Sequence, residues 1–398
     1  MNYRKNEKNG DELSILGFGC MRFPTKRNSI DEVRAEALII SAIELGVNYF
    51  DTAYVYNLGK SESMLGKVLS KGYRDRVKIA TKMPHFMVKT EADMDKIFNK
   101  QLQRLQTDRI DYYLFHMMPD VGTWERLKKI DIEKWIDNKK KNGQIINIGF
   151  SFHGVSDQFL KLVDVYDWDF CQIQFNYLDE NNQAGIGGLK YAASKGLAVI
   201  IMEPLRGGKI VNNLPKEVNN IWNNAKPKRT AAEWALRWVW NHSEATVVLS
   251  GMNSEEQVIE NIHTASSAEV NALSQEELAL FDKVKEILNQ NIKVNCTACG
   301  YCMPCPAGVD IPACFSILNE KYSLKTKNSK MHYLQNTGAI TSNPGYASLC
   351  RKCGKCETHC PQGIPIRQKL DIVSKEMEGA FFKPIVMLGR KIMKVKQH

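Results

Sequence analysis

The 398-residue sequence predicts an α/β chain in which a (β/α)8 barrel precedes a small, largely helical, cysteine-rich domain. Three observations lead to this prediction. Eight short apolar runs alternate with longer amphipathic stretches through residues 1–290, as in a (β/α)8 barrel. The G-x-G-x-x-G turn of a doubly wound sheet, the competing fold, is absent: Gly17-Phe18-Gly19 runs into Cys20-Met21-Arg22. Nine of the eleven cysteines lie in residues 291–398.

The expected elements follow one another in regular alternation. An Asn9-Gly10 pair predicts a hairpin turn ahead of the first barrel strand. The strand candidates are residues 14–20, 49–51, 77–81, 112–115, 145–150, 170–175, 198–202 and 246–249. Apolar residues at helical spacing predict helices over residues 31–45, 61–70, 93–105, 132–141, 157–165 and 231–240. Two more helices are expected over residues 275–289, which close the barrel domain, and 311–322.

Composition and charge set the domain boundary. Apolar residues make up 43% and charged residues 25% of the chain, as in an ordinary globular protein. No apolar run approaches the roughly 18–20 residues of a membrane-spanning helix and no signal core follows the N-terminus, so we expect no transmembrane segment and a cytoplasmic location. Residues 291–398 hold 16 of the 54 Lys and Arg but 6 of the 44 Asp and Glu, which leaves 38 of each sign before them. We therefore expect domains of residues 1–290 and 291–398.

Chemically versatile side chains follow three successive strands. Asp51 ends the second strand, Tyr56 lies five positions later, and Lys82 and His116 follow the third and fourth strands. In a (β/α)8 barrel these strand ends share one rim, which is where active sites lie. Taken singly, each residue has an ordinary structural interpretation as a cap, a surface aromatic, a solvated lysine or a core histidine. Together they predict an active site.

These four groups suit proton donation to a carbonyl group that receives hydride. A free phenol has a pKa near about 10, so Tyr56 is a usable acid, and a nearby ammonium such as Lys82 is expected to pull that pKa towards the working range. Asp51 can hold Lys82 charged and in place. A neutral His116 can orient the substrate oxygen through a hydrogen bond.

Over residues 1–290 the chain resembles the aldo-keto reductase family. The matching residues are Asp51-Thr52-Ala53 with Tyr56, Thr81-Lys82, Asp111-Tyr112-Tyr113-Leu114-Phe115-His116, and Gly59-Lys60-Ser61-Glu62 with Leu65-Gly66. The resemblance implies a TIM barrel that binds NAD(P)H across its rim and transfers hydride reversibly with an aldehyde or ketone. It implies that Tyr56 is the general acid, that Lys82 and Asp51 tune it, and that His116 orients the substrate.

The same resemblance implies where the cofactor lies. Ser151 and Gln172 match residues that hold the nicotinamide carboxamide, although Phe152 stands where many members have Asn. Met202 stands where several members stack an aromatic ring on the nicotinamide. The segment with Leu205, Arg206 and Gly208 is similar to a pyrophosphate-binding loop, and the other candidates near the nicotinamide and pyrophosphate are Gly19, Met21, Arg22 and Asp51.

A segment similar to the family's adenosine-binding region contains Gln257, Glu260 and Asn261. NADP-preferring members often place Arg or Lys there to meet the 2′-phosphate, for which Arg is well suited. Residues 251–261 contain neither Arg nor Lys, so the sequence favours NADH slightly over NADPH.

Two cysteine runs organise the second domain. They read Cys296-x2-Cys299-x2-Cys302-x2-Cys305-Pro306 and Cys350-x2-Cys353-x2-Cys356-x3-Cys360-Pro361. The second run has the spacing of bacterial ferredoxins, and the first is one residue shorter before its fourth cysteine. Zinc usually takes cysteines in pairs, and disulfides need an oxidising compartment that nothing here indicates. The runs therefore predict two [4Fe-4S] clusters in a ferredoxin-like domain.

In two-cluster ferredoxins the fourth cysteine of each run ligates the other cluster. This rule predicts one cluster on Cys296, Cys299, Cys302 and Cys360, and a second on Cys350, Cys353, Cys356 and Cys305. The long segment of residues 307–349 makes the domain larger than a minimal ferredoxin. We interpret Cys314, Cys20 and Cys171, which lie in apolar surroundings, as buried structural thiols.

The basic excess is concentrated near the second cysteine run, at Arg351, Lys352, Lys355 and Arg367, and in the tail of residues 381–395. It suits negatively charged cluster–thiolate assemblies and an acidic ferredoxin- or flavodoxin-like redox partner. For the tail, a membrane surface and a simple solvated end are further interpretations. Nucleic-acid binding is not expected, because aromatic residues are not interleaved with the charges.

The sequence therefore predicts an NAD(P)H-dependent oxidoreductase for a small carbonyl substrate, coupled to or accompanied by electron transfer through the clusters. Hydride carries two electrons and such a cluster usually one, so direct coupling normally needs a flavin, for which no motif is evident. The alternative is a regulatory protein that senses redox state through nicotinamide and clusters without turnover. The complete set of four rim residues argues against that alternative.

Overall fold

The chain forms two compact units in the computed structural model, which describes residues 1–27, 29–154, 156–212, 214–294, 296, 302–323, 328–340, 344–360 and 363–392. The first unit comprises Met1–Gly208 and Arg229–Leu278, and the second comprises Lys209–Lys228 and Ala279–His398. Within these described residues, no helix is both long and apolar enough to cross a membrane. The expected boundary near residue 290 stays a prediction.

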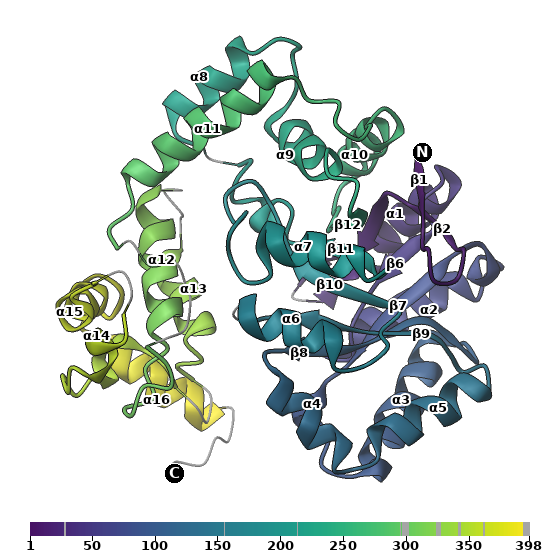
Figure 1. Ribbon diagram of the computed structural model, residues 1–398, viewed down its shortest axis with the longest axis horizontal. Coiled ribbons are helices and arrows are strands. Elements are labelled where there is room, and N and C mark those ends of the chain that lie inside the picture. Colours follow the sequence, from purple (N-terminus) through teal and green to yellow (C-terminus); the bar gives the residue numbers. More distant parts are fainter. Residues whose placement is uncertain are drawn as a thin grey trace. The chain divides into compact units, whose positions relative to one another are not determined.

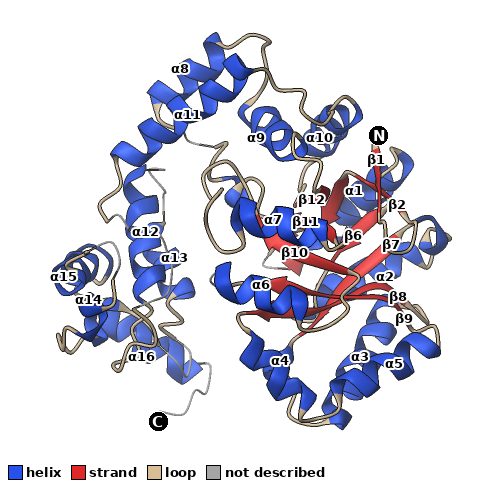
Figure 2. Cartoon of the chain, viewed as in Figure 1, coloured by secondary structure: helices blue, strands red, loops and turns tan. Residues whose placement is uncertain are grey.

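The first unit is a closed barrel of eight parallel strands, which confirms the predicted TIM barrel. The strands are β3 (Leu16–Gly19), β6 (Tyr49–Asp51), β7 (Lys78–Met83), β8 (Ile110–Met118), β9 (Ile145–Phe152), β10 (Phe170–Gln174), β11 (Ala198–Met202) and β12 (Ala245–Ser250). Their order around the barrel is β10-β11-β12-β3-β6-β7-β8-β9. Figure 2 shows the strands at the centre of this unit with helices around them.

Helices follow the strands and cover the barrel. They are α1 (Glu32–Glu44), α2 (Lys60–Leu69), α3 (Glu91–Leu105), α4 (Val121–Lys128), α5 (Ile132–Lys141), α6 (Ser156–Asp164), α7 (Gly185–Ser194), α9 (Ala231–Trp240) and α10 (Glu255–Ser266). Local sequence fixes several starts. Helix α3 begins with a capping box, in which the Asp93 amide donates to Thr90 Oγ1 and the Thr90 amide to Asp93 Oδ2.

The barrel interior is packed with side chains. The expected hairpin forms from β1 (Tyr3–Lys5) and β2 (Glu12–Ser14), and Leu13 of β2 joins the interior cluster. The other buried members of this cluster are Tyr49, Ala80, Tyr112, Leu114, Phe170, Ala198, Ile200, Val247 and Leu249. Such filling is general for this fold and leaves the C-terminal strand ends as the place for chemistry.

The second unit is helical where it is described. Its segment of residues 209–228 contributes α8 (Lys216–Asn224), which packs beside α11 (Gln275–Gln290) with the rings of Trp222 and Phe281 5.2 Å apart (Figure 1). The remaining helices are α12 (Ile311–Ser323), α13 (Ser329–Asn336), α14 (Lys355–Thr358), α15 (Ile366–Met377) and α16 (Phe382–Ile392). An apolar core that includes Phe315, Leu318 and Leu370 joins them. The predicted largely helical second part is confirmed.

Candidate active site and cluster ligands

The barrel brings the four predicted catalytic residues to its C-terminal rim. Asp51 is the last residue of β6, and Lys82 and His116 lie near the ends of β7 and β8. All three are buried. Tyr56 follows β6 in a short 3-10 turn, η2 (Tyr56–Gly59). Strand β7 extends two residues beyond its predicted end, so Lys82 lies within the strand and its side chain is fixed by the sheet.

A buried ion pair forms the base of the site. Lys82 Nζ donates to Asp51 Oδ1 and Oδ2 at 2.6 and 2.7 Å, and to the Thr52 carbonyl at 2.7 Å. Gln172 Nε2 donates to the same carboxylate at 3.1 Å. Burial opposes the charge on Lys82, but the Asp51 carboxylate and Tyr56 outweigh it and raise the pKa of Lys82. The lysine is therefore held as an ammonium.

Tyr56 lies over this pair. The Lys82 ammonium is 4.9 Å from the centre of the Tyr56 ring, and the His116 ring meets the Tyr56 ring edge-on at 5.8 Å. Burial raises the pKa of Tyr56, and Lys82 offsets only part of that rise. Lys82 thus acts in the expected direction, but the net shift is upward because desolvation of the phenolate is the larger effect. Tyr56 is a neutral phenol at neutral pH.

His116 is held uncharged. Burial, reinforced by the charge of Lys82, lowers its pKa to about 3. Its Nδ1 is buried and has no hydrogen-bond partner among the described residues. A neutral imidazole can orient an oxygen atom without introducing a second positive charge beside Lys82.

Two further histidines that the sequence analysis missed lie close enough to influence His116. His153 directly follows β9, and burial lowers its pKa to about 4. His85 follows β7, and burial also lowers its pKa. Arg126 Nη2 lies 3.1 Å from His85 Nδ1 and donates to the His85 carbonyl at 2.9 Å. The signal available in the sequence was the position of each histidine three or four residues beyond the end of a predicted strand.

We expect His116 to make the protein sensitive to acid. Its folded pKa of about 3 lies below the ordinary 6.5, so the unfolded chain binds more protons below pH 6.5. Stability from this group is complete above pH 6.5 and is lost as the pH falls, by about 2 kcal/mol between pH 7 and pH 5. Urea unfolding at both pH values should show a smaller loss for His116→Asn. The exposed His263 provides the control, since His263→Asn should keep the parent's loss; equal losses in all three proteins would contradict the prediction.

The predicted nicotinamide ligands are neighbours across two strands. Ser151 of β9 and Gln172 of β10 are direct partners in the sheet register. Ser151 Oγ accepts from the Met117 amide at 2.8 Å, so it is already engaged by β8. Gln172 Oε1 is buried and has no partner among the described residues. Met202, at the end of β11, packs against the interior cluster.

Arg22 follows β3 and contacts two other segments beside the rim, one after β11 and one after β12. A Cβ placed on Gly207 would meet Arg22 Nη2 at 2.6 Å, and one on Gly251 would meet Arg22 Cβ at 3.2 Å. The guanidinium is 3.7 Å from a Glu203 oxygen. Only glycines allow this close approach. Met21, which precedes Arg22, is 51% exposed.

The other predicted cofactor residues have local partners. Arg206 Nε pairs with Asp179 at 3.0 Å, and the Gly208 amide donates to the Leu205 carbonyl at 2.8 Å. The Arg206 charge is therefore already balanced. Gly19 is packed against the Ser250 carbonyl.

In the segment compared with adenosine-binding regions, the Gln257 side chain accepts from the Asn253 amide at 2.9 Å. Asn261 Nδ2 donates to Ser250 Oγ at 3.0 Å, and Glu260 accepts from Thr230. Gln257 is exposed and Asn261 is buried. These side chains are thus engaged by Asn253 within the segment and by Ser250 and Thr230 outside it, and the exposed Gln257 is the one that a ligand could reach.

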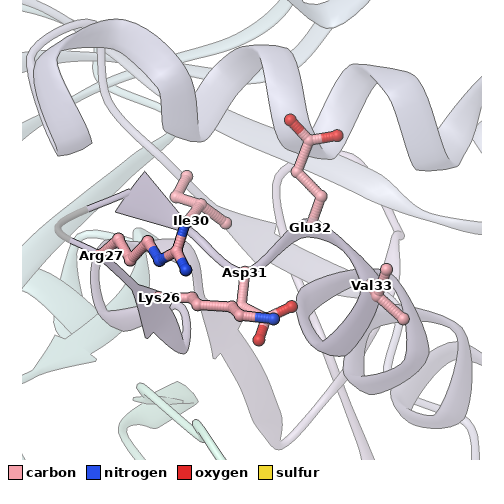
Figure 3. A pocket seen from close by; sticks show the side chains of 6 residues that line it. All are labelled: Lys26, Arg27, Ile30, Asp31, Glu32 and Val33. Atoms are coloured by element: carbon pink, nitrogen blue, oxygen red, sulfur yellow. The ribbon is translucent and has the colours of Figure 1, made fainter.

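A separate surface pocket of about 370 Å³ lies beside the hairpin of β4 (Thr25–Lys26) and β5 (Ser29–Ile30). Figure 3 shows its lining residues: Lys26, Arg27 and Ile30 belong to the hairpin, and Asp31, Glu32 and Val33 lie at the start of α1. None of the predicted catalytic or cofactor residues lines it. We assign it no part in the site described above.

In the second unit, four of the predicted cluster ligands line one cavity. They are Cys305 from the first run and Cys350, Cys353 and Cys356 from the second. Cys353 is exposed and Cys356 is buried, and the Lys352 amide lies 3.4 Å from Cys350 Sγ. Four thiols facing one cavity, with an amide directed at a sulfur, are a donor set that suits an iron–sulfur cluster. In the part of the chain that the structure describes, no His, Cys, Asp and Glu side chains converge closely enough to hold a single metal ion.

The other predicted cluster is only partly described. Cys296, Cys302 and Cys360 are half-buried against the apolar core of the second unit, and Cys299 lies outside the described residues. Cys314 is buried with its Sγ 3.5 Å from the Gly345 carbonyl, as expected for a structural thiol.

The two cysteines of the barrel are also buried. Cys171 lies in β10 as expected. Cys20 lies one residue beyond β3, in the turn η1 (Cys20–Arg22), and not in the strand as predicted, because the strand ends at Gly19.

Comparison with known families and proteins gives two domain matches. Residues 15–286 match the model of the aldo/keto reductase family, and residues 295–364 match the model of a 4Fe-4S dicluster domain. The first match spans well over half of the chain.

Individual relatives match the barrel region. L-galactose dehydrogenase of Arabidopsis thaliana is 26% identical over 300 residues, covering 70% of this chain and 92% of the relative. The NADH-specific methylglyoxal reductase of Escherichia coli is 23% identical, covering 63% and 89%. An aldo-keto reductase of Bacillus halodurans, solved in its holo form, superposes with a TM-score of 0.58 at 26% identity, covering 71% of this chain and 96% of that structure. A Klebsiella pneumoniae aldo-keto reductase in complex with NADPH has a TM-score of 0.57 at 22% identity, covering 72% and 95%.

Proposed function

We propose, because the chain belongs to the aldo/keto reductase family, that it is an NAD(P)H-dependent oxidoreductase acting on a small carbonyl compound. We assign this reaction to residues 1–290 and two [4Fe-4S] clusters to residues 291–398. One observation carries the proposal: the Tyr56 ring lies over the Lys82–Asp51 ion pair, with the His116 ring beside it.

In the reducing direction Tyr56 gives its phenolic proton to the carbonyl oxygen. A dihydronicotinamide held near Gln172 would supply the hydride for the carbonyl carbon. Lys82 stabilises the phenolate left on Tyr56, because an ammonium is held next to the developing negative charge. Solvent returns a proton to Tyr56 after turnover. His116 orients the carbonyl oxygen, and Asp51 keeps Lys82 in place. The reverse reaction oxidises an alcohol through the same groups.

The chain offers groups that fit a nicotinamide. The Gln172 Oε1 acceptor lacks a partner among the described residues, and the carboxamide of nicotinamide carries an N–H₂ donor. Arg22 lies over Gly207 and Gly251, where backbone and a guanidinium together suit a pyrophosphate. The absence of Arg and Lys from residues 251–261 supports NADH as the preferred cofactor, and one relative is named as NADH-specific.

We expect Arg22→Ala to weaken NADH binding about tenfold, the usual value of a hydrogen bond to a charged group. Fluorescence titration of NADH measures this directly. Arg76→Ala is the matched control, since both side chains are 47% exposed and each pairs with a glutamate. Arg76 precedes β7 at the opposite end of that strand from Lys82. If the two variants bind NADH with equal affinity, the assignment of Arg22 to the cofactor site is wrong.

Electron transfer through the clusters is the second part of the proposal. The Cys305, Cys350, Cys353 and Cys356 cavity supports one cluster, and the exposed Cys353 gives that cluster a short route to the surface. Exposed Arg351, Lys352 and Lys355 lie next to it in sequence, although Lys352 pairs with Asp371 at 3.0 Å. An acidic one-electron carrier, such as a ferredoxin- or flavodoxin-like protein, suits this surface.

An anaerobic experiment tests both parts. The purified protein is mixed with NADH or NADPH, and cluster reduction is followed by EPR with and without added flavin while a panel of aldehydes and ketones is assayed. Turnover of a carbonyl compound supports hydride transfer, and a reduced-cluster signal at a comparable rate supports coupling. If the protein neither turns over a carbonyl compound nor binds either cofactor, the oxidoreductase proposal is rejected. Cofactor-dependent cluster changes without turnover would favour the regulatory alternative.

A further inference from the structure

Glu62 is a fully buried carboxylate that neither the catalytic residues nor the cofactor region uses. It lies in the first turn of α2. Its Oε1 accepts from Thr81 Oγ1 at 2.7 Å and Gln101 Nε2 at 2.8 Å, and its Oε2 accepts from Arg104 Nη1 at 3.0 Å. A buried charge is costly unless it is paired and hydrogen-bonded, and here both oxygens are satisfied.

Arg104 contacts the loop that carries Tyr56 on both sides of that residue. Its Nη1 also donates to the Tyr54 carbonyl at 2.9 Å, and its guanidinium carbon lies 4.4 Å from the centre of the Tyr54 ring. A Cβ on Gly59 would meet Arg104 Nη2 at 2.5 Å, so the guanidinium lies directly on the glycine backbone. Arg104 therefore contacts the residue two before Tyr56 and the residue three after it.

This loop needs external support. Asn57, Leu58 and Gly59 have φ values of 50°, 57° and 85°, which is the left-handed region that side-chain-bearing residues disfavour. Leu58 is 94% exposed, so its own side chain does not hold the loop in place. Consecutive residues in this region persist only where the surroundings hold them, and they occur preferentially at functional sites.

The same network reaches the lysine of the ion pair. Gln101 Nε2 donates to the Lys82 carbonyl at 3.1 Å, and Gln101 Oε1 accepts from Tyr113 OH at 2.8 Å. Glu62 thus connects the Tyr56 loop to the Lys82 peptide. One of its oxygens accepts from Arg104, which contacts the loop, and the other accepts from Gln101, which donates to the Lys82 carbonyl.

We propose that Glu62 and Arg104 are positioning residues that set the placement of Tyr56 relative to Lys82. Neither touches the reacting atoms. Their effect rests on the proposed function, in which Tyr56 donates a proton whose loss Lys82 stabilises. A displacement of about 1 Å in such an arrangement can reduce a rate about a hundredfold.

Arg104→Lys and Glu62→Gln test the proposal with small changes. A lysine nitrogen can still bond Glu62 and the Tyr54 carbonyl, which both accept from Arg104 Nη1, but it has no second nitrogen to cover Gly59 and no planar group to lie over the Tyr54 ring. We expect Arg104→Lys to lower kcat at least tenfold with an unchanged Kd for NADH. We also expect Arg104→Ala to lower kcat further and to regain activity with millimolar guanidinium chloride, a rescue that a general loss of stability would not give.

Arg74→Lys is the matched control. Arg74 pairs with the buried Asp111 at 2.8 Å, and its side chain is 14% exposed against 18% for Arg104. It bonds the Val77 carbonyl at the start of β7, at the opposite end from Lys82. We expect Arg74→Lys to lower the unfolding temperature without changing kcat.

Two results overturn the positioning role: a kcat for Arg104→Lys equal to that of Arg74→Lys, or no rescue of a folded Arg104→Ala. If either result is obtained and Tyr56→Phe is inactive, the positioning role of Arg104 is rejected, but the proposed function is not. An active Tyr56→Phe rejects the proposed function itself, whatever Arg104 does.

Discussion

Tyr56→Phe should lower kcat for carbonyl reduction about 100- to 10,000-fold, the range that a positioned general acid contributes. The phenol carries its proton at neutral pH and lies against the Lys82 ammonium, whereas the N–H groups of Lys82 are engaged by Asp51 and the Thr52 carbonyl. Phe keeps the ring and its contact with His116, so the fold and the affinity for NADH should be unchanged. Steady-state kinetics and a fluorescence titration of NADH on the same preparation measure both quantities.

Tyr73→Phe is the matched control for this experiment. Tyr73 also has a cation over its ring, with the Arg76 guanidinium carbon 5.5 Å from the ring centre, but it precedes β7 and lies away from the rim. Its variant should keep full activity. If Tyr56→Phe retains more than one-tenth of the parent's kcat, the assignment of Tyr56 as the proton donor is wrong.

Most of the barrel could be predicted because its pattern is repetitive and local. All eight predicted strands occur, since a parallel strand that is buried on both faces is recorded in the sequence as a short apolar run. The helices over Ile132–Lys141 and Ala231–Trp240 match residue for residue, because their apolar spacing is regular and they have clear ends. Strand ends were less certain, as β7 shows by continuing through Lys82 to Met83.

One feature of the fold was beyond the sequence analysis. The segment of residues 209–228 belongs with the second unit, where Trp222 meets Phe281, and a contact between segments so far apart leaves no local pattern. Its helix α8 buries Val218 and Trp222, which are four residues apart, so that helix alone carried a readable signal.

Within the site, the sequence located the proposed catalytic groups better than the groups proposed to position them. Tyr56, Lys82 and His116 stand out because each follows a strand. Glu62 and Arg104 lie inside amphipathic helices, where charged residues are usually solvated, and only the packing of α2 against α3 buries Glu62 fully and Arg104 in part. The net pKa shift of Tyr56 was missed for the same reason, because burial depends on the folded surroundings.

Removing one predicted ligand of one of the two predicted clusters should halve the iron content. We expect the anaerobically purified protein to carry about eight iron atoms per chain, as two [4Fe-4S] clusters require, and Cys353→Ser to carry about four. Cys353 is exposed, so its replacement disturbs the packing of the second unit least. Iron analysis and the EPR spectrum of the dithionite-reduced protein measure the loss.

Cys305→Ser separates the two ways of pairing the cysteine runs. Cys305 belongs to the first run in sequence but shares a cavity with Cys350, Cys353 and Cys356 of the second. Crossed pairing therefore predicts that Cys305→Ser and Cys353→Ser lose the same EPR signal, and that the double variant loses no further iron. Pairing within each run predicts instead that the single variants lose different signals and that the double variant loses nearly all its iron. Cys314→Ala, which removes a buried thiol outside both runs, should keep the parent's iron and both signals.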